Sequence, residues 1–461
     1  MEIKDKKPEG YINNAVNFRE KVFTEIAGEG ADQVWLKASL KDVKRAVIIN
    51  SAPRSGSSLL FAILRKISQF YSLSGEDVPF YKLNGISKDA SLSDDIPVGF
   101  EGPGACTFGM SRDFLSDFSL ANSGNDIFKS DRLLNQYIND LALRFPLQWP
   151  QVNFSYDVFI NLARLAFNNY RTAHKGFLKE EFYLELLLLL KREYKVINPY
   201  YYDIPVSMVR RRFGGVKIPS GPPNPVIMIE EPPFILLSPG KKVNSLDLSG
   251  KTLLLKSSIN SYRMRFIERL LPHADIKIIY LIRNPAASIN GLYDGWLHRG
   301  FFSHNLKETG FKMLKISGYS DKFDWGKWWW NYDLPGGWQD YTRSKLEEVC
   351  AFQWHAANSR IQEYLHKSRK KYCLVRHENI VRSLGSRKQE IGSILDFVGI
   401  ERRAMEQLGL DNLSVVQATK APQPYRWKKR KSLLAPILNS PEIGKMAGLL
   451  GYDKKNIKEW L

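Results

Sequence analysis

The chain has 461 residues, 44% of them hydrophobic, which is enough to bury a substantial core in one elaborated domain or in two or three smaller ones. Its formal net charge of +19 points to an anionic ligand, an acidic partner or a nucleic acid. The three cysteines, Cys106, Cys350 and Cys373, lie too far apart for a metal-ligand spacing or a disulfide framework.

The first ten residues are charged and lack the apolar stretch of a secretory signal. The longest leucine run, residues 186–190, is far shorter than the roughly 20 apolar residues that span a bilayer. We therefore predict a cytoplasmic protein without a membrane span.

Strands and helices are predicted to alternate along most of the chain. Residues 1–40 are expected to form a peripheral helical extension, and the main domain is expected to run from residue 41 to 461. Apolar runs predict strands at 46–50, from 71, and at 226–229, 252–255, 276–282 and 372–375. Helical spacing predicts helices after residue 56, at 262–271, from 286, at 347–366 and at 391–398. This alternation predicts an α/β fold with a central parallel sheet flanked by helices.

Two segments interrupt the alternation. Residues 100–225 are helical in pattern up to about residue 194 and then rich in Pro and Gly, so they are predicted to form a helical insertion. Residues 296–341 are crowded with aromatic side chains and glycines, including the run Trp328, Trp329 and Trp330. Consecutive tryptophans cannot all face one core, because neighbouring side chains point in different directions.

The segment N-S-A-P-R-S-G-S-S, residues 50–58, joins the first strand to its helix. A helix N-terminus after such a turn presents backbone N–H groups and a dipole that favour a phosphate. A Walker A loop would have lysine directly after Gly56, where this chain has Ser57, and the cation lies earlier, at Arg54. The pattern therefore disfavours kinases and ATPases; an ordinary strand-to-helix connection is the alternative.

P-R-S-G-S-S after an apolar strand resembles the 5′-phosphosulfate loop of the sulfotransferase family, whose donor is 3′-phosphoadenosine 5′-phosphosulfate (PAPS). A second segment, I-I-Y-L-I-R-N-P at 278–285, is similar to the family's 3′-phosphate motif. In outline the resemblance covers residues 43–453, and it implies a P-loop-like fold. It also implies that Arg283 binds the 3′-phosphate and that the 5′-phosphate lies among Arg54, Ser55, Gly56, Ser57 and Ser58.

One position departs from the family pattern. Eight residues after the arginine of the second motif the family usually has serine, and this chain has Gly291. Ser288 and Asn290 are polar residues on the same expected helix, and we assign Ser288 to the donor site in its place.

Two further resemblances concern catalysis. S-G-E-D-V-P, residues 74–79, is similar to the segment that supplies the general base in tyrosylprotein-type and several bacterial sulfotransferases, which implies Glu76 as base with Asp77 as the alternative. Lys256, at the end of a predicted strand, resembles the lysine that stabilises the transition state, and Arg265 is a weaker partner for the same anion. A turn-capping Glu76 and a solvated strand-end Lys256 are the structural alternatives.

Two segments are assigned to the nucleotide. V-R-H-E-N, residues 375–379, looks like the family's Y-E-D segment, with His377 in the place of the adenine-binding tyrosine. The basic run at 425–430 resembles the loop that closes over the donor, which implies donor contacts from Arg426, Trp427 and Lys428. A solvated basic run is the alternative.

We therefore predict a sulfotransferase that uses PAPS as co-substrate and a hydroxyl or amine of a small-molecule or glycan as acceptor. Residues 296–341 are expected to form a lid over this acceptor, or else a second small core. The seven histidines lack metal-site spacing, so no metal is expected. The rival hypothesis is a nucleic-acid-binding protein without catalysis, which would use the excess charge and the interleaved aromatics. The sequence sets no oligomeric state.

Overall fold

The computed structural model describes residues 7–28, 38–86, 93–96, 108–120, 125–298 and 300–460. Its centre is a seven-stranded sheet in the order β4-β3-β2-β5-β1-β6-β9. Five neighbours are parallel: β2 (Phe70–Ser72), β5 (Thr252–Lys256), β1 (Arg45–Asn50), β6 (Asp275–Ile282) and β9 (Tyr372–Arg376). Two short antiparallel strands, β3 (Ser119–Leu120) and β4 (Lys241–Lys242), extend the β2 side. The predicted α/β fold, with a mainly parallel sheet flanked by helices, is confirmed.

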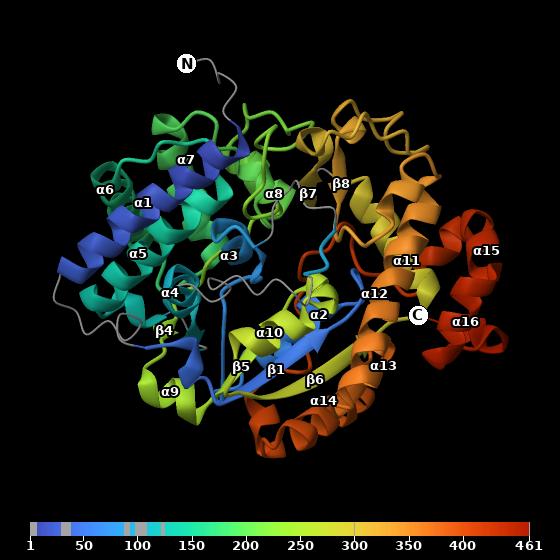
Figure 1. Ribbon diagram of the computed structural model, residues 1–461. Coiled ribbons are helices and arrows are strands. Elements are labelled where there is room, and N and C mark those ends of the chain that lie inside the picture. The colour runs from blue at the N-terminus through green and yellow to red at the C-terminus, as the bar shows by residue number, and fades with distance from the viewer. Residues whose placement is uncertain are drawn as a thin grey trace.

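The alternating side chains of β1 enter two hydrophobic cores on opposite faces of the sheet. Val47 and Ile49 belong to the core that contains side chains of α2 (Ser57–Leu64) and α14 (Leu384–Val398). Ala46 and Ile48 belong to the larger core, together with α10 (Met264–Leu270) and α12 (Leu346–Ser368). Figure 1 shows α10 above the sheet and α14 below it.

A helical lobe lies to one side of the sheet, on the left in Figure 1. Its helices are α1 (Pro8–Gly28), α3 (Val78–Leu83), α4 (Phe108–Asp117), α5 (Asp131–Gln148), α6 (Tyr156–Ala173), α7 (Lys179–Glu193) and α8 (Val206–Arg212). Helix α1 packs on α5, and a buried ion pair of 2.8 Å between Arg19 and Asp113 joins it to α4. The N-terminal helix is therefore built into the core of this lobe. No described helix is long and apolar enough to cross a membrane.

On the other side lie three further helices and a hairpin, as Figure 1 shows. They are α11 (Pro285–Trp296), α15 (Lys431–Asn439), α16 (Pro441–Leu449), β7 (Phe302–Asn305) and β8 (Trp329–Asn331). Helix α9 (Ser245–Gly250) precedes β5, and α13 (His377–Arg382) follows β9.

The tryptophans expected in a lid instead form a buried cluster. Trp330 packs with ring centroids 5.2 Å from Trp296 and 5.7 Å from Trp338, and all three are almost fully buried. Trp329, its neighbour on β8, is also buried, against Phe302. Both faces of this short strand are covered by protein, so consecutive tryptophans are buried without a ligand. These rings belong to the larger core that also contains side chains of α10 and α12, and not to a separate small one.

The strand predicted at 226–229 is wrong. Ile227, Met228 and Ile229 are buried, which accounts for the apolar run, but the segment has an irregular backbone. The side-chain oxygen of Asn224 accepts the N–H groups of Val226 and Ile227, and the flanking prolines lack the N–H group that a ladder requires.

Candidate functional site

A tight loop at 51–56 connects β1 to α2, and its conformation depends on glycine. Gly56, at the start of α2, has φ of +92°, and Arg54 is also left-handed with φ of +64°. A Cβ added at Gly56 would lie 2.2 Å from Nδ1 of His377, so a side chain there would clash with the imidazole. The loop backbone therefore lies directly against the start of α13.

The carboxyl ends of the parallel strands bring three predicted cations to one edge of the sheet. In the parallel register Ile49 of β1 is opposite Lys256 of β5, and Asn50 is opposite Tyr280 of β6, three residues before Arg283. Arg54, in the loop after β1, Lys256 and Arg283 all line one cavity of about 650 Å³, which we call the loop cavity. Open parallel sheets bind ligands at such an edge.

Arg283 lies in a crowded positive environment. One guanidinium nitrogen donates to the Arg54 carbonyl at 3.2 Å, while its buried Nε has no hydrogen-bond partner within the described residues. Burial, with the nearby charges of Arg54 and Arg426, lowers the pKa of Arg283 to about 10 in spite of Glu378. Because each of these groups is more stable beside an anion, this end of the loop cavity is suited to phosphate.

His377 lies beside Arg283 and Gly56 in the wall of the loop cavity. Burial and the charge of Arg283 lower the pKa of His377 well below its usual value, so the ring is neutral at pH 7. Its Nδ1 is buried and meets no partner in the described part of the chain. The role of this ring in nucleoside binding stays a prediction.

Glu76 and Lys256 form an ion pair in the wall of the loop cavity. Lys256 is buried at the end of β5, and Glu76, in the loop before α3, remains about one-third exposed. Ser257 Oγ donates to the same carboxylate at 3.0 Å. The carboxylate and the cation predicted to act in catalysis therefore touch each other and face the loop.

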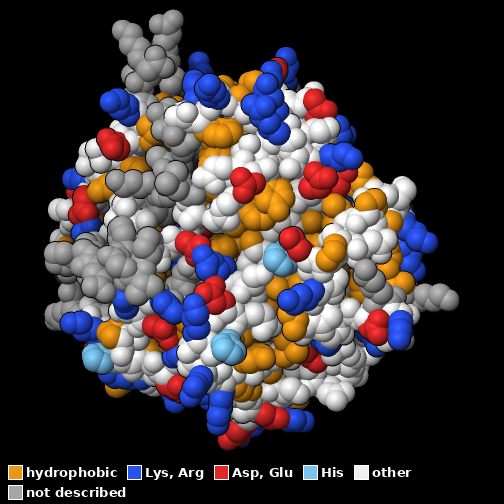
Figure 2. Space-filling view, turned by 45° about the vertical axis from the view of Figure 1, so that its right-hand side comes forward, with side chains coloured by type: hydrophobic (Ala, Val, Ile, Leu, Met, Phe, Trp, Pro, Cys, Tyr) orange, Lys and Arg blue, Asp and Glu red, His pale blue; other side chains and the backbone are white. Residues whose placement is uncertain are grey.

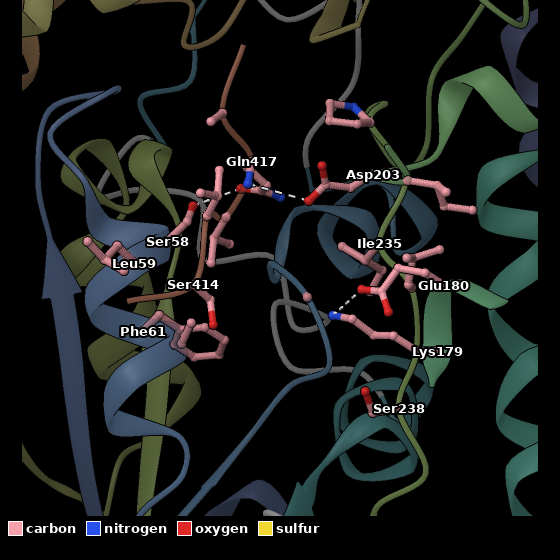
Figure 3. A pocket seen from close by; sticks show the side chains of 18 of the residues that line it. Ser58, Leu59, Phe61, Lys179, Glu180, Asp203, Ile235, Ser238, Ser414 and Gln417 are labelled. Carbon is pink, nitrogen blue, oxygen red and sulfur yellow. Dashed lines mark hydrogen bonds and ion pairs between the residues drawn. The ribbon is translucent and has the colours of Figure 1, made fainter. Parts of the chain in front are cut away.

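A second cavity of about 990 Å³, which we call the tyrosine cavity, lies on the other side of this pair. Its walls include Leu59 and Phe61 of α2, the start of α7, and the segment that contains Tyr200, Tyr201 and Tyr202. Figure 3 shows Ser58, Leu59 and Phe61 facing Asp203 and Ile235 across it. Glu76 and Lys256 line both cavities, so they mark the place where the two meet.

Residues 413–418, the strap, also line both cavities. The side-chain oxygen of Gln417 accepts from Ser58 Oγ at 2.7 Å, and its carbonyl accepts from Arg54 at 3.1 Å. The Gln417 N–H donates to Asp203 at 3.4 Å across the tyrosine cavity, as Figure 3 shows. Gln417 thus forms hydrogen bonds with Arg54 and Ser58, two residues that were predicted to bind phosphate.

The predicted loop residues differ in how they lie. Arg54, Gly56, Ser57 and Ser58 line the loop cavity, whereas Ser55 is buried behind it. Asp77, the alternative base, is also buried: Tyr81 donates to it at 3.0 Å, and burial raises its pKa. Because Asp77 lies outside the cavity wall, the geometry favours Glu76.

Three other predicted residues lie away from the cavity. Ser288 is fully buried inside α11, while Asn290 reaches the wall and accepts from Arg430 at 2.6 Å. Arg265 is exposed on α10. Arg263, two residues earlier, points inward and pairs with Asp94. Lys428 is exposed, its ammonium lies 3.8 Å from the centre of the Tyr425 ring, and it does not line the loop cavity, so its contact with the donor stays a prediction.

Arg426 and Trp427, the other two predicted donor residues of the basic run, do line the loop cavity. Arg426 forms an ion pair of 2.9 Å with Asp294 of α11, and the Trp427 indole N–H donates to the Trp460 carbonyl at 3.1 Å. Asp294 also binds Lys420 and Arg430. A single buried carboxylate thus holds the C-terminal segment against the cavity.

Sequence reasoning missed Glu231 as a cavity residue, and it included Phe301, His304 and Tyr332 only as part of the predicted lid at 296–341. Burial and the charge of Glu76 raise the pKa of Glu231 to about 7. The sequence feature that could have indicated Glu231 is the acidic pair followed by two prolines, E-E-P-P at 230–233, in a basic chain. No group of three or more potential metal ligands is brought together by the described residues.

Comparison with known proteins gives a weak structural similarity. No family model and no curated protein matches the sequence. A solved structure, the sulfotransferase domain from the Synechococcus PCC 7002 olefin synthase, is 12% identical, with 90% of this chain and 96% of that domain covered and a TM-score of 0.31. Similarity at this level carries no weight for function, which has to be inferred from the site itself.

Proposed function

We propose that this protein is a sulfotransferase that transfers a sulfuryl group from PAPS to a hydroxyl of a small-molecule or glycan acceptor. The observation that carries the proposal is the convergence of Arg54, Lys256 and Arg283 on one sheet edge, beside the carboxylate of Glu76. Three cations suit a donor with two phosphate positions and a sulfonate, and the carboxylate suits an acceptor that must lose a proton. We propose in addition that the protein is cytoplasmic, as predicted from the sequence.

The residues of the loop cavity fit this donor. Arg283 Nε and His377 Nδ1 are buried polar atoms without partners in the described chain, and a phosphate and a nucleoside would supply them. The Gly56 turn brings the loop backbone against His377, so both belong to the same cavity wall. Arg54, Ser57 and Ser58 would hold the 5′-phosphate, Arg283 the 3′-phosphate, and His377 with Trp427 the nucleoside. The donor supplies an activated sulfuryl group.

The chemistry then divides between Glu76 and the cations. As the acceptor oxygen forms its bond to sulfur, its proton passes to Glu76, and the bond from sulfur to the bridging phosphate oxygen breaks. The leaving 3′,5′-adenosine bisphosphate keeps that oxygen and its electron pair. Lys256, which pairs with Glu76, is placed to neutralise negative charge on the transferring group and leave the carboxylate free to act as base. Positioned cations and a base of this kind accelerate reactions without a metal.

The rival hypothesis of a nucleic-acid-binding protein has less support. A basic surface for a nucleic acid requires cations gathered along a groove or patch. Figure 2 shows a face on which Lys and Arg side chains are spread among acidic and apolar ones. The cations that gather in one place are instead Arg54, Lys256 and Arg283, which line the loop cavity.

Calorimetric titration with 3′,5′-adenosine bisphosphate tests the donor site. We expect it to bind more tightly than adenosine 5′-phosphate, which lacks the 3′-phosphate, and Arg283→Ala to remove this preference. Arg403→Ala, a change at an exposed arginine, is the matched control and should leave the preference intact. Equal affinity of the unchanged protein for both nucleotides would contradict the role of Arg283, and failure to bind either would contradict the proposed function.

A further inference from the structure

The loop cavity has a second polar end, formed by residues that the proposed reaction does not use. Glu231 comes from the irregular segment after residue 226, and Ser303 and His304 come from β7. His304 is only 6% exposed, yet it lines the cavity. Its Nδ1 is buried and has no hydrogen-bond partner within the described residues.

Asp94 orients the His304 ring. His304 Nε2 lies 3.4 Å from the Asp94 carboxylate, which also accepts from Arg263 at 2.6 Å and from the Leu334 N–H at 2.7 Å. Burial opposes ionisation of Asp94, but His304 and Arg263 hold its pKa below the usual range. An ionised Asp94 can only accept, so His304 Nε2 carries a proton toward it, and Nδ1 is the polar atom of the ring that points away from Asp94.

Glu231 is held in the same wall. Ser303 Oγ donates to its carboxylate at 2.9 Å and accepts the Tyr332 N–H at 2.8 Å, so the carboxylate position is fixed through β7 and β8. Glu231 is close enough to Glu76 and to His304 for their charges to influence its ionisation. The end of the cavity with Glu231 and His304 therefore adjoins the proposed reaction centre.

A buried polar atom without a partner destabilises a fold, so natural proteins rarely keep one that nothing binds. The Glu231 carboxyl oxygens can accept a hydrogen bond, and His304 Nδ1 needs a partner, so the ligand group should be able both to donate and to accept. The cavity wall contains both signs of charge, with Arg54, Lys82 and Lys256 beside Glu76, Glu230 and Glu231, so an uncharged group suits it. A hydroxyl is uncharged, donates and accepts, and is the group that the proposed reaction already requires of the acceptor.

We propose that Glu231 and His304 form a subsite for a second hydroxyl of the acceptor, so that the acceptor is a diol or sugar-like polyol. One hydroxyl lies at Glu76 and a neighbouring one is bound by Glu231 and His304. The subsite sets specificity and does not take part in bond making. This inference rests on the proposed function, since it places the acceptor relative to Glu76.

The test compares two probes that differ by one hydroxyl, trans-1,2-cyclohexanediol and cyclohexanol. Their dissociation constants are measured by NMR titration of the protein saturated with 3′,5′-adenosine bisphosphate. We expect the diol to bind about tenfold more tightly, which is the size of one good hydrogen bond. In Glu231→Ala and in His304→Ala this preference should fall to about twofold or less, while Glu401→Ala, at an exposed residue, should keep it.

Bisphosphate affinity, measured for every variant, shows whether the site remains folded. If His304→Ala does not fold, Glu231→Gln is the second variant, because it keeps the size of the side chain and the contact with Ser303. Equal binding of both probes by the unchanged protein, or an undiminished preference in folded Glu231 and His304 variants, would overturn the subsite. Absence of bisphosphate binding would overturn the proposed function instead, so the two failures are distinguishable.

Discussion

Gly291 of α11 lies directly against Arg54 of the loop: a Cβ added at Gly291 would be 3.1 Å from the Cβ of Arg54. By the resemblance of residues 278–285 to the 3′-phosphate motif, this is the position at which sulfotransferases usually have serine. The contact gives a physical reason for the departure, because a side chain here would press on the arginine that the loop directs into the cavity. The room that serine would need is occupied by Arg54.

We therefore expect Gly291→Ser to weaken bisphosphate binding and not to improve it. Crowding of a packed position costs about 1–3 kcal/mol, and part of this would appear as displacement of Arg54, so affinity should fall roughly five- to tenfold. Titration calorimetry measures the change. Gly385→Ser is the matched control, since a Cβ there meets no atom within 4 Å. Tighter binding by Gly291→Ser would show that serine fits as it does in the family.

Glu76 is the proposed base, and Glu76→Gln keeps its shape but cannot take up a proton. Turnover should fall by about two to four decades, while bisphosphate affinity stays within about twofold. Asp77→Asn is the matched change at the neighbouring residue; it preserves the contact with Tyr81, so turnover should change little. An inactive Asp77→Asn beside an active Glu76→Gln would assign the base to Asp77.

The parts of the fold that could be predicted are those encoded in short stretches of chain. The apolar runs of β1, β5 and β6 each lead into a cation or a cation-bearing loop, and a parallel sheet places those ends together. Residues 226–229 looked the same but follow Asn224 and lie between prolines, which gave a buried irregular segment. Local pattern reports burial more reliably than it reports backbone conformation.

The rest of the site depends on contacts between distant segments, which have no local signal. His304 and Asp94 are 210 residues apart in the chain, and Gln417 meets a loop more than 350 residues earlier. Trp329 and Trp330 were expected either in a lid over the acceptor or in a second small core, and the packing of Trp296, Trp338 and Phe302 covers both of them. Only the three-dimensional arrangement shows which groups face the cavity.

Gln417 occupies two groups of the loop, so it should compete with a phosphate there. In Gln417→Gly the side chain that holds Ser58 is removed, and glycine tolerates the φ of +45°, so the backbone of the strap keeps its course. We expect bisphosphate to bind about two- to tenfold more tightly, because less binding energy goes into displacing the strap. Val415→Gly, at an exposed residue of the strap, controls for added flexibility. Weaker binding by Gln417→Gly would mean that Gln417 is a donor ligand.

The raised pKa of Glu231 predicts a pH dependence of stability. Burial and the charge of Glu76 raise this pKa from 4.5 to about 7 in the folded protein. Between these values the folded protein retains a proton that the unfolded chain has lost, so stability falls as pH rises through this window. Below this pH window Glu231 is protonated in both the folded and the unfolded protein, and above it Glu231 is ionised in both. The contribution of Glu231 to stability therefore does not change with pH outside the window. The full change is at most about 3 kcal/mol.

In Glu231→Gln the side chain cannot ionise, so the variant should not show this fall in stability with rising pH. Relative to the unchanged protein, its free energy of unfolding should rise by about 2–3 kcal/mol between pH 4.5 and pH 8, as measured by urea denaturation. Glu230, whose pKa burial also raises to about 7, is present in both proteins, so its contribution cancels in the difference. Parallel stability curves for the two proteins would show that Glu231 is already ionised at pH 5, and that the cavity wall around it is more polar than its contacts imply.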